Sequence, residues 1–252
     1  MAGRDPPVCG LTFRNSRLET QKNNKQMPED QHITWHRLAD SAAVARDAAV
    51  RIQQAADEAI AQRGTFRLVL AGGRTPEATY RLLADTDADW PHWEIYFGDE
   101  RCLPADHADR NDTMAARAWL DHVDIPRQRI HIIPAGLGPT EGALRYAAEI
   151  SAALPFDLVI LGLGVDGHTA SLFPGHDHPE QKLVVPVTNA PKPPSERISL
   201  SAKALSQTRQ VLVLVTGKEK RHAVARWKAG ENIPIAGIVP SGPLEILLDL
   251  PV

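Results

Sequence analysis

The chain has 252 residues, 43% of them hydrophobic and 23% charged, and a formal net charge of −3 at pH 7. Such a composition supports a substantial buried core but gives no bulk attraction to nucleic acid or to an anionic membrane, so we expect neither partner. With no apolar run of membrane-spanning length, no secretory signal, and no metal or disulfide spacing between Cys9 and Cys102, we expect a cytoplasmic protein.

Residues 1–29 are polar and lack an amphipathic period, and Met27 stands just before the regular pattern begins. They predict a disordered tail or an overlong start. A targeting arm is the alternative, but Asp5 and Glu19 do not suit an amphipathic transit helix. Residues 30–252 contain no clear linker or repeat, so we expect them to form one domain.

The predicted domain alternates between helices and short apolar strands. A helix is expected over 40–63, begun by Asp40 or Ser41 and ended by Gly64. A strand at 65–71 leads into GGRTPEATYRLLA, in which Thr75 is the expected N-cap and Pro76 the first helical residue. The same alternation predicts strands at 93–98, 129–134, 156–162, 209–217 and 244–250, and helices at 111–123, 140–154 and 218–230.

Continuous apolar strands separated by helices are typical of a parallel sheet covered on both faces. The predicted fold class is therefore α/β: a single doubly wound, mostly parallel sheet with helices on both faces, similar to a Rossmann fold. Residues 174–200 are expected to form irregular insertions. Ligands of such sheets bind beyond the carboxyl ends of the strands, where three loops should converge: GGRTP, GDERC and GLGVDGHTAS.

The GGRTP loop suits a phosphate, because Gly72 and Gly73 allow close backbone approach and Arg74 and Thr75 open a helix N-terminus. A plain strand-to-helix turn explains it equally well. The loop is neither a Walker A motif nor a dinucleotide-binding motif, so nucleotide binding has little support.

The second loop places Asp99 and Arg101 at a strand end, where they could bind sugar hydroxyls or form only an exposed ion pair. In the third loop, Asp166 and His168 stand two residues apart among glycines. Histidine is the natural general base near neutral pH, and a carboxylate can fix its tautomer. For an isolated DGH segment, a histidine bonded to the loop backbone is the simpler interpretation.

The histidines at 168, 176 and 178 match no metal-binding pattern, and Pro174 and Gly175 break any helix that could align them, so no metal is expected. Lys192 and Arg197 lie on the proline-rich loop NAPKPPSER. They are either solvent-exposed or placed to neutralise a phosphate near GGRT.

Four ordered motifs resemble those of the 6-phosphogluconolactonase family, relatives of the glucosamine-6-phosphate deaminases. The motifs are LAGGRTP, IYFGDER, FDLVILGLGVDGHTASLFPG and PKPPSER, with TGKEKR later, and the resemblance spans about residues 30–250. It implies a sugar-phosphate-binding α/β fold that hydrolyses the δ-lactone of 6-phosphogluconate, in the oxidative pentose phosphate pathway, without metal or organic cofactor.

By this resemblance, His168 is the base and Asp166 orients the imidazole or the loop. Asp99 and Arg101 shape the sugar site, and Asn111 matches the family although its neighbours Arg110 and Asp112 do not. The phosphate would be held by Gly72, Gly73, Arg74, Thr75, Lys192 and Arg197.

Two other functions stay open at this point. A deaminase shares the GGxTP loop but has a glutamate in the segment after the DGH histidine, where this chain has Ser171, Leu172 and Phe173. A non-catalytic sugar-phosphate-binding regulator would have lost the base or the phosphate loop. A monomer or a homodimer is expected.

Overall fold

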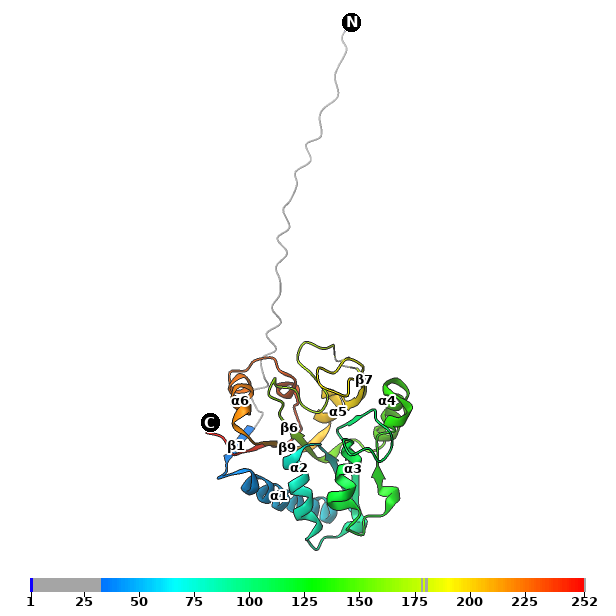
Figure 1. Ribbon diagram of the computed structural model, residues 1–252, viewed down its shortest axis with the longest axis vertical. Helices are drawn as coiled ribbons and strands as arrows, with labels where there is room; N and C mark the ends of the chain where they lie inside the picture. Colours follow the sequence, from blue (N-terminus) through cyan, green and yellow to red (C-terminus); the bar gives the residue numbers. More distant parts are fainter. Residues whose placement is uncertain (2–32, 178, 180, 252) are drawn as a thin grey trace.

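The computed structural model describes residue 1, residues 33–177, residue 179 and residues 181–251, and its core is a seven-stranded parallel sheet (Figure 1). The predicted tail at 1–29 therefore lies outside the described residues, except for Met1. The strand order is β1-β10-β9-β6-β2-β3-β5, and every neighbouring pair is parallel. The strands are β1 Ile33–Arg37, β2 Phe66–Leu70, β3 Trp93–Phe97, β5 Ile130–His131, β6 Phe156–Gly162, β9 Thr208–Val215 and β10 Leu244–Leu248.

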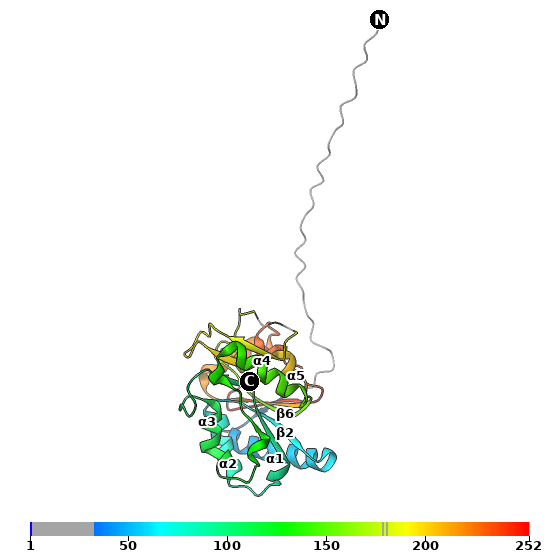
Figure 2. The same cartoon turned by 90° about the vertical axis from the view of Figure 1, so that its right-hand side faces the viewer.

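Helices cover the sheet on both faces, which confirms the predicted α/β class. Figure 2 shows α1, α2 and α3 on one side of the sheet and α4 and α5 on the other. Trp227 of α6 packs edge-on against Trp35 of β1, with 5.2 Å between ring centroids. The helices are α1 Ser41–Arg63, α2 Arg74–Ala84, α3 Asn111–Ala115, α4 Pro139–Ser151, α5 Ala202–Ser206 and α6 Arg221–Lys228.

The long helix α1 has the ends that its sequence predicts. The Asp40 carboxylate accepts a hydrogen bond of 2.7 Å from the Ala43 amide and so caps the first turn. Gly64 ends the helix in the left-handed conformation, with φ of 75°, which glycine adopts without steric cost. The alanine-rich buried face lets the helix lie close to the sheet.

The predicted start of α2 is wrong by two residues. The helix begins at Arg74 with Gly73 as N-cap, and Gly73 has a φ of 111° that disfavours other residues. The Thr75 hydroxyl does not cap the helix; it forms a hydrogen bond of 2.6 Å with the hydroxyl of Thr216, the residue directly after β9. The glycine turn itself sets the helix start, and the threonine joins two neighbouring loops.

A second, antiparallel sheet corrects the expectation of irregular structure over 174–200. Its order is β4-β8-β7, with β4 Asp99–Arg101, β7 Val184–Val187 and β8 Arg197–Leu200. It branches from the main sheet at Gly98, whose amide donates to Leu70 O of β2 while its carbonyl accepts from Leu200 N of β8. The small sheet, packed against α4, therefore lies beside the carboxyl ends of the central strands.

Three smaller differences concern single elements: two lengths and one strand that the sequence does not predict. The helix expected over 111–123 is α3 followed by a π-helical stretch, Ala116–Leu120. The strand expected over 129–134 is limited to Ile130–His131, and β1 was not expected at all.

The order of the strands creates a switch point between β2 and β6. From β2 the chain proceeds outward to β3 and β5, then returns to β6 beside β2 and proceeds outward to β9 and β10. Loops that leave neighbouring strands in opposite directions open a crevice at this point. The GGRTP loop follows β2 and the GLGVDGH loop follows β6, so the two predicted loops flank this crevice.

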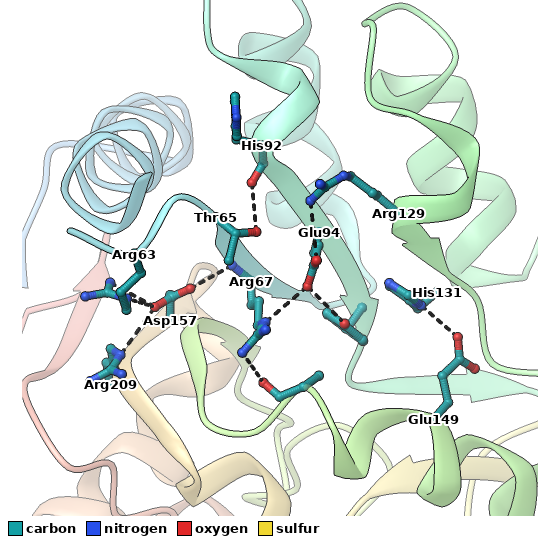
Figure 3. A network of polar contacts seen from close by, with 12 residues as sticks. Arg63, Thr65, Arg67, His92, Glu94, Arg129, His131, Glu149, Asp157 and Arg209 are labelled. Atoms are coloured by element: carbon teal, nitrogen blue, oxygen red, sulfur yellow. Dashed lines mark hydrogen bonds and ion pairs between the residues drawn. The ribbon is translucent and has the colours of Figure 1, made fainter. Parts of the chain in front are cut away.

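The amino ends of the strands carry a different kind of polar cluster (Figure 3). The Asp157 carboxylate, 7% exposed, lies 2.9 Å from Arg63 Nη2 and 3.4 Å from Arg209 Nε, and accepts a hydrogen bond of 2.8 Å from the Arg67 amide. Glu94 pairs with the Arg67 and Arg129 side chains. These contacts satisfy buried charge and join strands, which is a structural role.

Candidate active site

The GGRTP loop lines an open cavity of about 570 Å³ at the carboxyl ends of β2, β6 and β9. Its walls include Gly72, Gly73, Arg74 and Thr75, four of the six residues predicted to bind phosphate; Lys192 and Arg197 do not line it. The amides at the start of α2 face this region with the positive end of the helix dipole. The cavity thus brings together all the predicted features of an anion-binding loop.

Lys220, which the sequence did not single out, adds an ammonium group to the same cavity. Burial lowers the pKa of Lys220, Lys192 and Arg74 lower it further, and Glu219 and Asp166 act in the opposite direction. Arg74 and Glu219 line the same cavity as Lys220. Lys220 lies in the TGKEKR motif, Thr216–Arg221, which begins 48 residues after His168.

The side chains of His168 and Asp166, predicted from the sequence to act together, are in contact in the structure. His168 Nδ1 lies 2.5 Å from Asp166 Oδ1, and the His168 amide also approaches this oxygen, at 3.3 Å. Burial lowers the pKa of His168, partly offset by Asp166; Lys192 also lowers it and Asp99 raises it. The imidazole is therefore neutral near pH 7, and within the described part of the chain its Nε2 has no hydrogen-bond partner.

Gly164 explains how this pair fits on so short a loop. A Cβ atom added at Gly164 would lie 2.0 Å from His168 Nδ1 and 2.6 Å from Asp166 Oδ1. The loop closes on itself through a hydrogen bond of 2.7 Å from the Gly164 amide to His168 O. The imidazole and the carboxylate thus pack directly on the glycine backbone, and any side chain at position 164 would displace them.

Downstream of the histidine, the chain turns into the core instead of toward the cavity. Ala170 has a left-handed φ of 47°, and the Thr169 hydroxyl donates to Gly162 O at 2.9 Å. Leu172 and Phe173 are each 1% exposed. This segment therefore presents no carboxylate beside the pair.

Asp99 and Asn111 form a buried bridge between the two loops. The Asp99 carboxylate accepts hydrogen bonds of 2.6 Å from Ser171 Oγ and 3.2 Å from Asn111 Nδ2. The Asn111 side chain packs so closely on Gly72 that a Cβ there would lie 2.0 Å from Asn111 Oδ1. The bridge joins the phosphate loop to the segment that follows the histidine.

The DER triplet is not an exposed ion pair. Glu100 is fully buried, and its carboxylate accepts from the backbone amides of Asn111 and Asp112 at 2.8 Å each, so that it caps α3. The Arg101 guanidinium donates to Asp109 O. Arg110, the departure from the family pattern, forms a two-pronged ion pair with Asp112.

Of the two cations on the proline-rich loop, only Lys192 is exposed. Arg197 is 6% exposed and donates to the carbonyl oxygens of Pro194, Lys192 and Pro193 at 3.0–3.2 Å. Its guanidinium carbon also lies 5.7 Å from the Phe173 ring centroid. Arg197 therefore holds in place the loop that carries Lys192.

The described residues contain neither a metal-binding cluster nor a membrane-spanning helix. No group of three or more His, Cys, Asp or Glu side chains there is placed to hold a metal ion; His178 lies outside the described residues. None of the helices described is long and apolar enough to cross a membrane.

Together, the fold and the site define an α/β enzyme with a histidine–carboxylate pair beside a cationic pocket. The family model for glucosamine-6-phosphate isomerases and 6-phosphogluconolactonase matches residues 39–246. The chain belongs to this family, which confirms the resemblance of its motifs.

Several of the similar proteins are named 6-phosphogluconolactonase. The 6-phosphogluconolactonase of Synechocystis sp. is 38% identical over 207 residues, which cover 76% of this chain and 85% of that protein. The enzyme of the same name from Streptomyces coelicolor is 36% identical over 234 residues, covering 84% and 89%. The crystal structure of 6-phosphogluconolactonase from Thermotoga maritima superposes with a TM-score of 0.81 at 26% identity, covering 86% of this chain and 99% of that one.

Proposed function

We propose that this protein hydrolyses 6-phospho-D-glucono-1,5-lactone to 6-phosphogluconate in the oxidative pentose phosphate pathway. The observation that carries the proposal is the His168–Asp166 pair beside a cluster of cations at the switch point of the sheet. The names of its relatives support the same activity. We further propose that the protein is cytoplasmic, that it acts as a monomer or a homodimer, and that it needs neither a metal nor an organic cofactor.

In the proposed mechanism, the Asp166 carboxylate accepts a hydrogen bond from Nδ1–H of His168, and this tautomer leaves the lone pair on Nε2. Nε2 removes a proton from the water that attacks C1 of the lactone. The imidazolium then returns the proton to the departing ring oxygen, and backbone amides or a cation stabilise the tetrahedral oxyanion. Since lactones already hydrolyse slowly in water, a base and good positioning are sufficient.

The substrate phosphate is proposed to bind at the N-terminus of α2, between the GGRTP loop and the cations Lys220, Arg74 and Lys192. Arg197 contributes by shaping the loop of Lys192. Asp99, Arg101 and Asn111 border the sugar site. Asp99 and Asn111 act chiefly by joining the GGRTP loop to the segment that follows His168.

The direct test is an acid-release assay with freshly generated lactone, corrected for spontaneous opening. We expect hydrolysis well above the uncatalysed rate and no ammonia from glucosamine 6-phosphate. The buried Leu172 and Phe173 are the structural reason, because they leave the pair without the additional carboxylate of a deaminase. Ammonia release without lactone hydrolysis would assign the chain to the deaminases. The absence of both products would favour a sugar-phosphate-binding regulator.

Neutralising Lys220 is expected to affect substrate binding more than turnover. In Lys220→Met we expect KM to rise roughly 10- to 100-fold, the value of a lost charge-assisted hydrogen bond to a phosphate, with kcat within about threefold of the parent. Lys192→Met should act in the same direction but less, since Lys192 is exposed. Steady-state kinetics measure both values, and Lys203→Met, on α5, is the matched control; an unchanged KM in Lys220→Met would exclude this site for the phosphate.

A further inference from the structure

The loop that carries the catalytic pair is held from outside by Arg226 of α6. Arg226 Nη1 donates a hydrogen bond of 3.0 Å to the carbonyl oxygen of Asp166, and Arg226 Nε donates one of 2.7 Å to Glu231 Oε2. Asp166 is thus bound at both ends, its carboxylate by His168 and its carbonyl by Arg226. A guanidinium fixed by two acceptors is a rigid support.

A second contact joins the same two segments. Ile233, 1% exposed, packs on Gly167, where an added Cβ would lie 3.1 Å from Ile233 Cβ. Backbone hydrogen bonds from Glu231 N to Arg226 O at 3.0 Å and from Ile233 N to Glu231 O at 2.8 Å hold these side chains together. The end of α6 and the turn after it therefore contact two consecutive residues of the loop, Asp166 and Gly167.

The same helical segment leads back to the cavity. Lys220 directly precedes α6, six residues before Arg226, a rise of roughly 9 Å along a helix. One short rigid element thus connects the proposed phosphate ligand with the support of the base loop. Lys220 at one end would hold the phosphate of the substrate, and Arg226 at the other end supports the loop whose base would act on the lactone ring.

We propose that Arg226 is a positioning residue of the reaction: by binding the Asp166 carbonyl, it places His168 at the correct distance from a substrate whose phosphate is held at Lys220. The inference rests on the proposed function. Its physical basis is that a base displaced by about 1 Å can lose about a hundredfold in rate although every catalytic group is present. Arg226 itself touches neither the substrate nor the reacting atoms.

The test is Arg226→Met, which keeps the aliphatic stem and removes both donors. We expect kcat to fall about tenfold, while KM and the inhibition constant of inorganic phosphate change less than about twofold, because the phosphate site is intact. Arg226→Lys should recover part of the loss, since one ammonium can still reach the Asp166 carbonyl. Glu231→Gln, which weakens only the outer contact, should lose less than Arg226→Met.

Arg221→Met is the matched control, because Arg221 is exposed on the same helix and makes no hydrogen bond or ion pair with the described residues. We expect it to have the kinetics of the parent. A lower melting temperature for Arg226→Met with unchanged kcat would show a purely structural role and overturn the proposal. A rise in KM as large as the loss of kcat would assign Arg226 to substrate binding and overturn it as well.

A measurement without turnover separates this proposal from the proposed function. The Gly164 and Gly167 amides close the loop by hydrogen bonds to His168 O and Gly164 O. We expect both amides to exchange with solvent faster in Arg226→Met than in the parent and in Arg221→Met. If the exchange is faster but the chain hydrolyses no lactone, the proposed function is wrong while Arg226 still stabilises the loop. Unchanged exchange would overturn the positioning role.

Discussion

Replacing His168 with alanine is expected to lower kcat for lactone hydrolysis by roughly 10²- to 10⁴-fold, the usual contribution of a general base. KM should stay within about threefold, because the phosphate loop and Lys220 do not depend on the imidazole. The fold should persist, since His168 makes its side-chain hydrogen bond only to Asp166 among the described residues. Initial rates measured against the spontaneous reaction, with circular dichroism as a check of folding, test this expectation.

His92→Ala is the matched control, because His92 lies at the amino end of β3, on the opposite edge of the sheet (Figure 3). It should retain the activity of the parent. Near-normal turnover of His168→Ala would exclude His168 as the base, and the activity would then need another proton acceptor at the switch point.

The pH dependence provides an independent check on the same residue. Burial lowers the pKa of His168 below its ordinary value of 6.5, and the pKa of Asp166 is also below its usual range. A base must be unprotonated, so kcat/KM should fall as the pH drops through the pKa of His168, with a midpoint below 6.5. A profile from about pH 5 to about pH 8 measures this midpoint, which should disappear in His168→Ala.

The sequence predicts the main sheet well because its signals are local. The caps of α1 at Asp40 and Gly64 follow from side-chain chemistry within one turn, and β6 is an uninterrupted apolar run between turns. The second sheet is different. Its strand β7, Val184–Val187, contains a proline, and β8 is only four residues long, so neither has the length or alternation that identifies a strand.

In the candidate site too, the sequence predicts only what local signals determine. The glycines and the DGH segment could be recognised because their geometry is set within a few residues of each other. Lys220 and Arg226 could not, since a charged residue on a helix is typical of a solvated face. Only the path of β6 and β9 as neighbours brings α6 to the base loop, and this pairing is a property of the whole sheet.

Gly164 offers the sharpest test of the site's geometry, because the change adds one methyl group and removes nothing. In Gly164→Ala the new Cβ would lie 2.0 Å from His168 Nδ1 and 2.2 Å from Cε1, far inside van der Waals contact, so the imidazole must move. We expect kcat to fall about a hundredfold, as for a base displaced by about 1 Å, with KM and inhibition by inorganic phosphate almost unchanged.

Gly136→Ala is the matched control, since a Cβ added there meets nothing within 4 Å. It should behave as the parent in both kinetics and melting temperature. Combining Gly164→Ala with His168→Ala should cost little more than His168→Ala alone, because both changes remove the same positioned base. If Gly164→Ala instead kept the kcat of the parent, or if its loss added fully to that of His168→Ala, the close packing of the imidazole on Gly164 would not be what places the base.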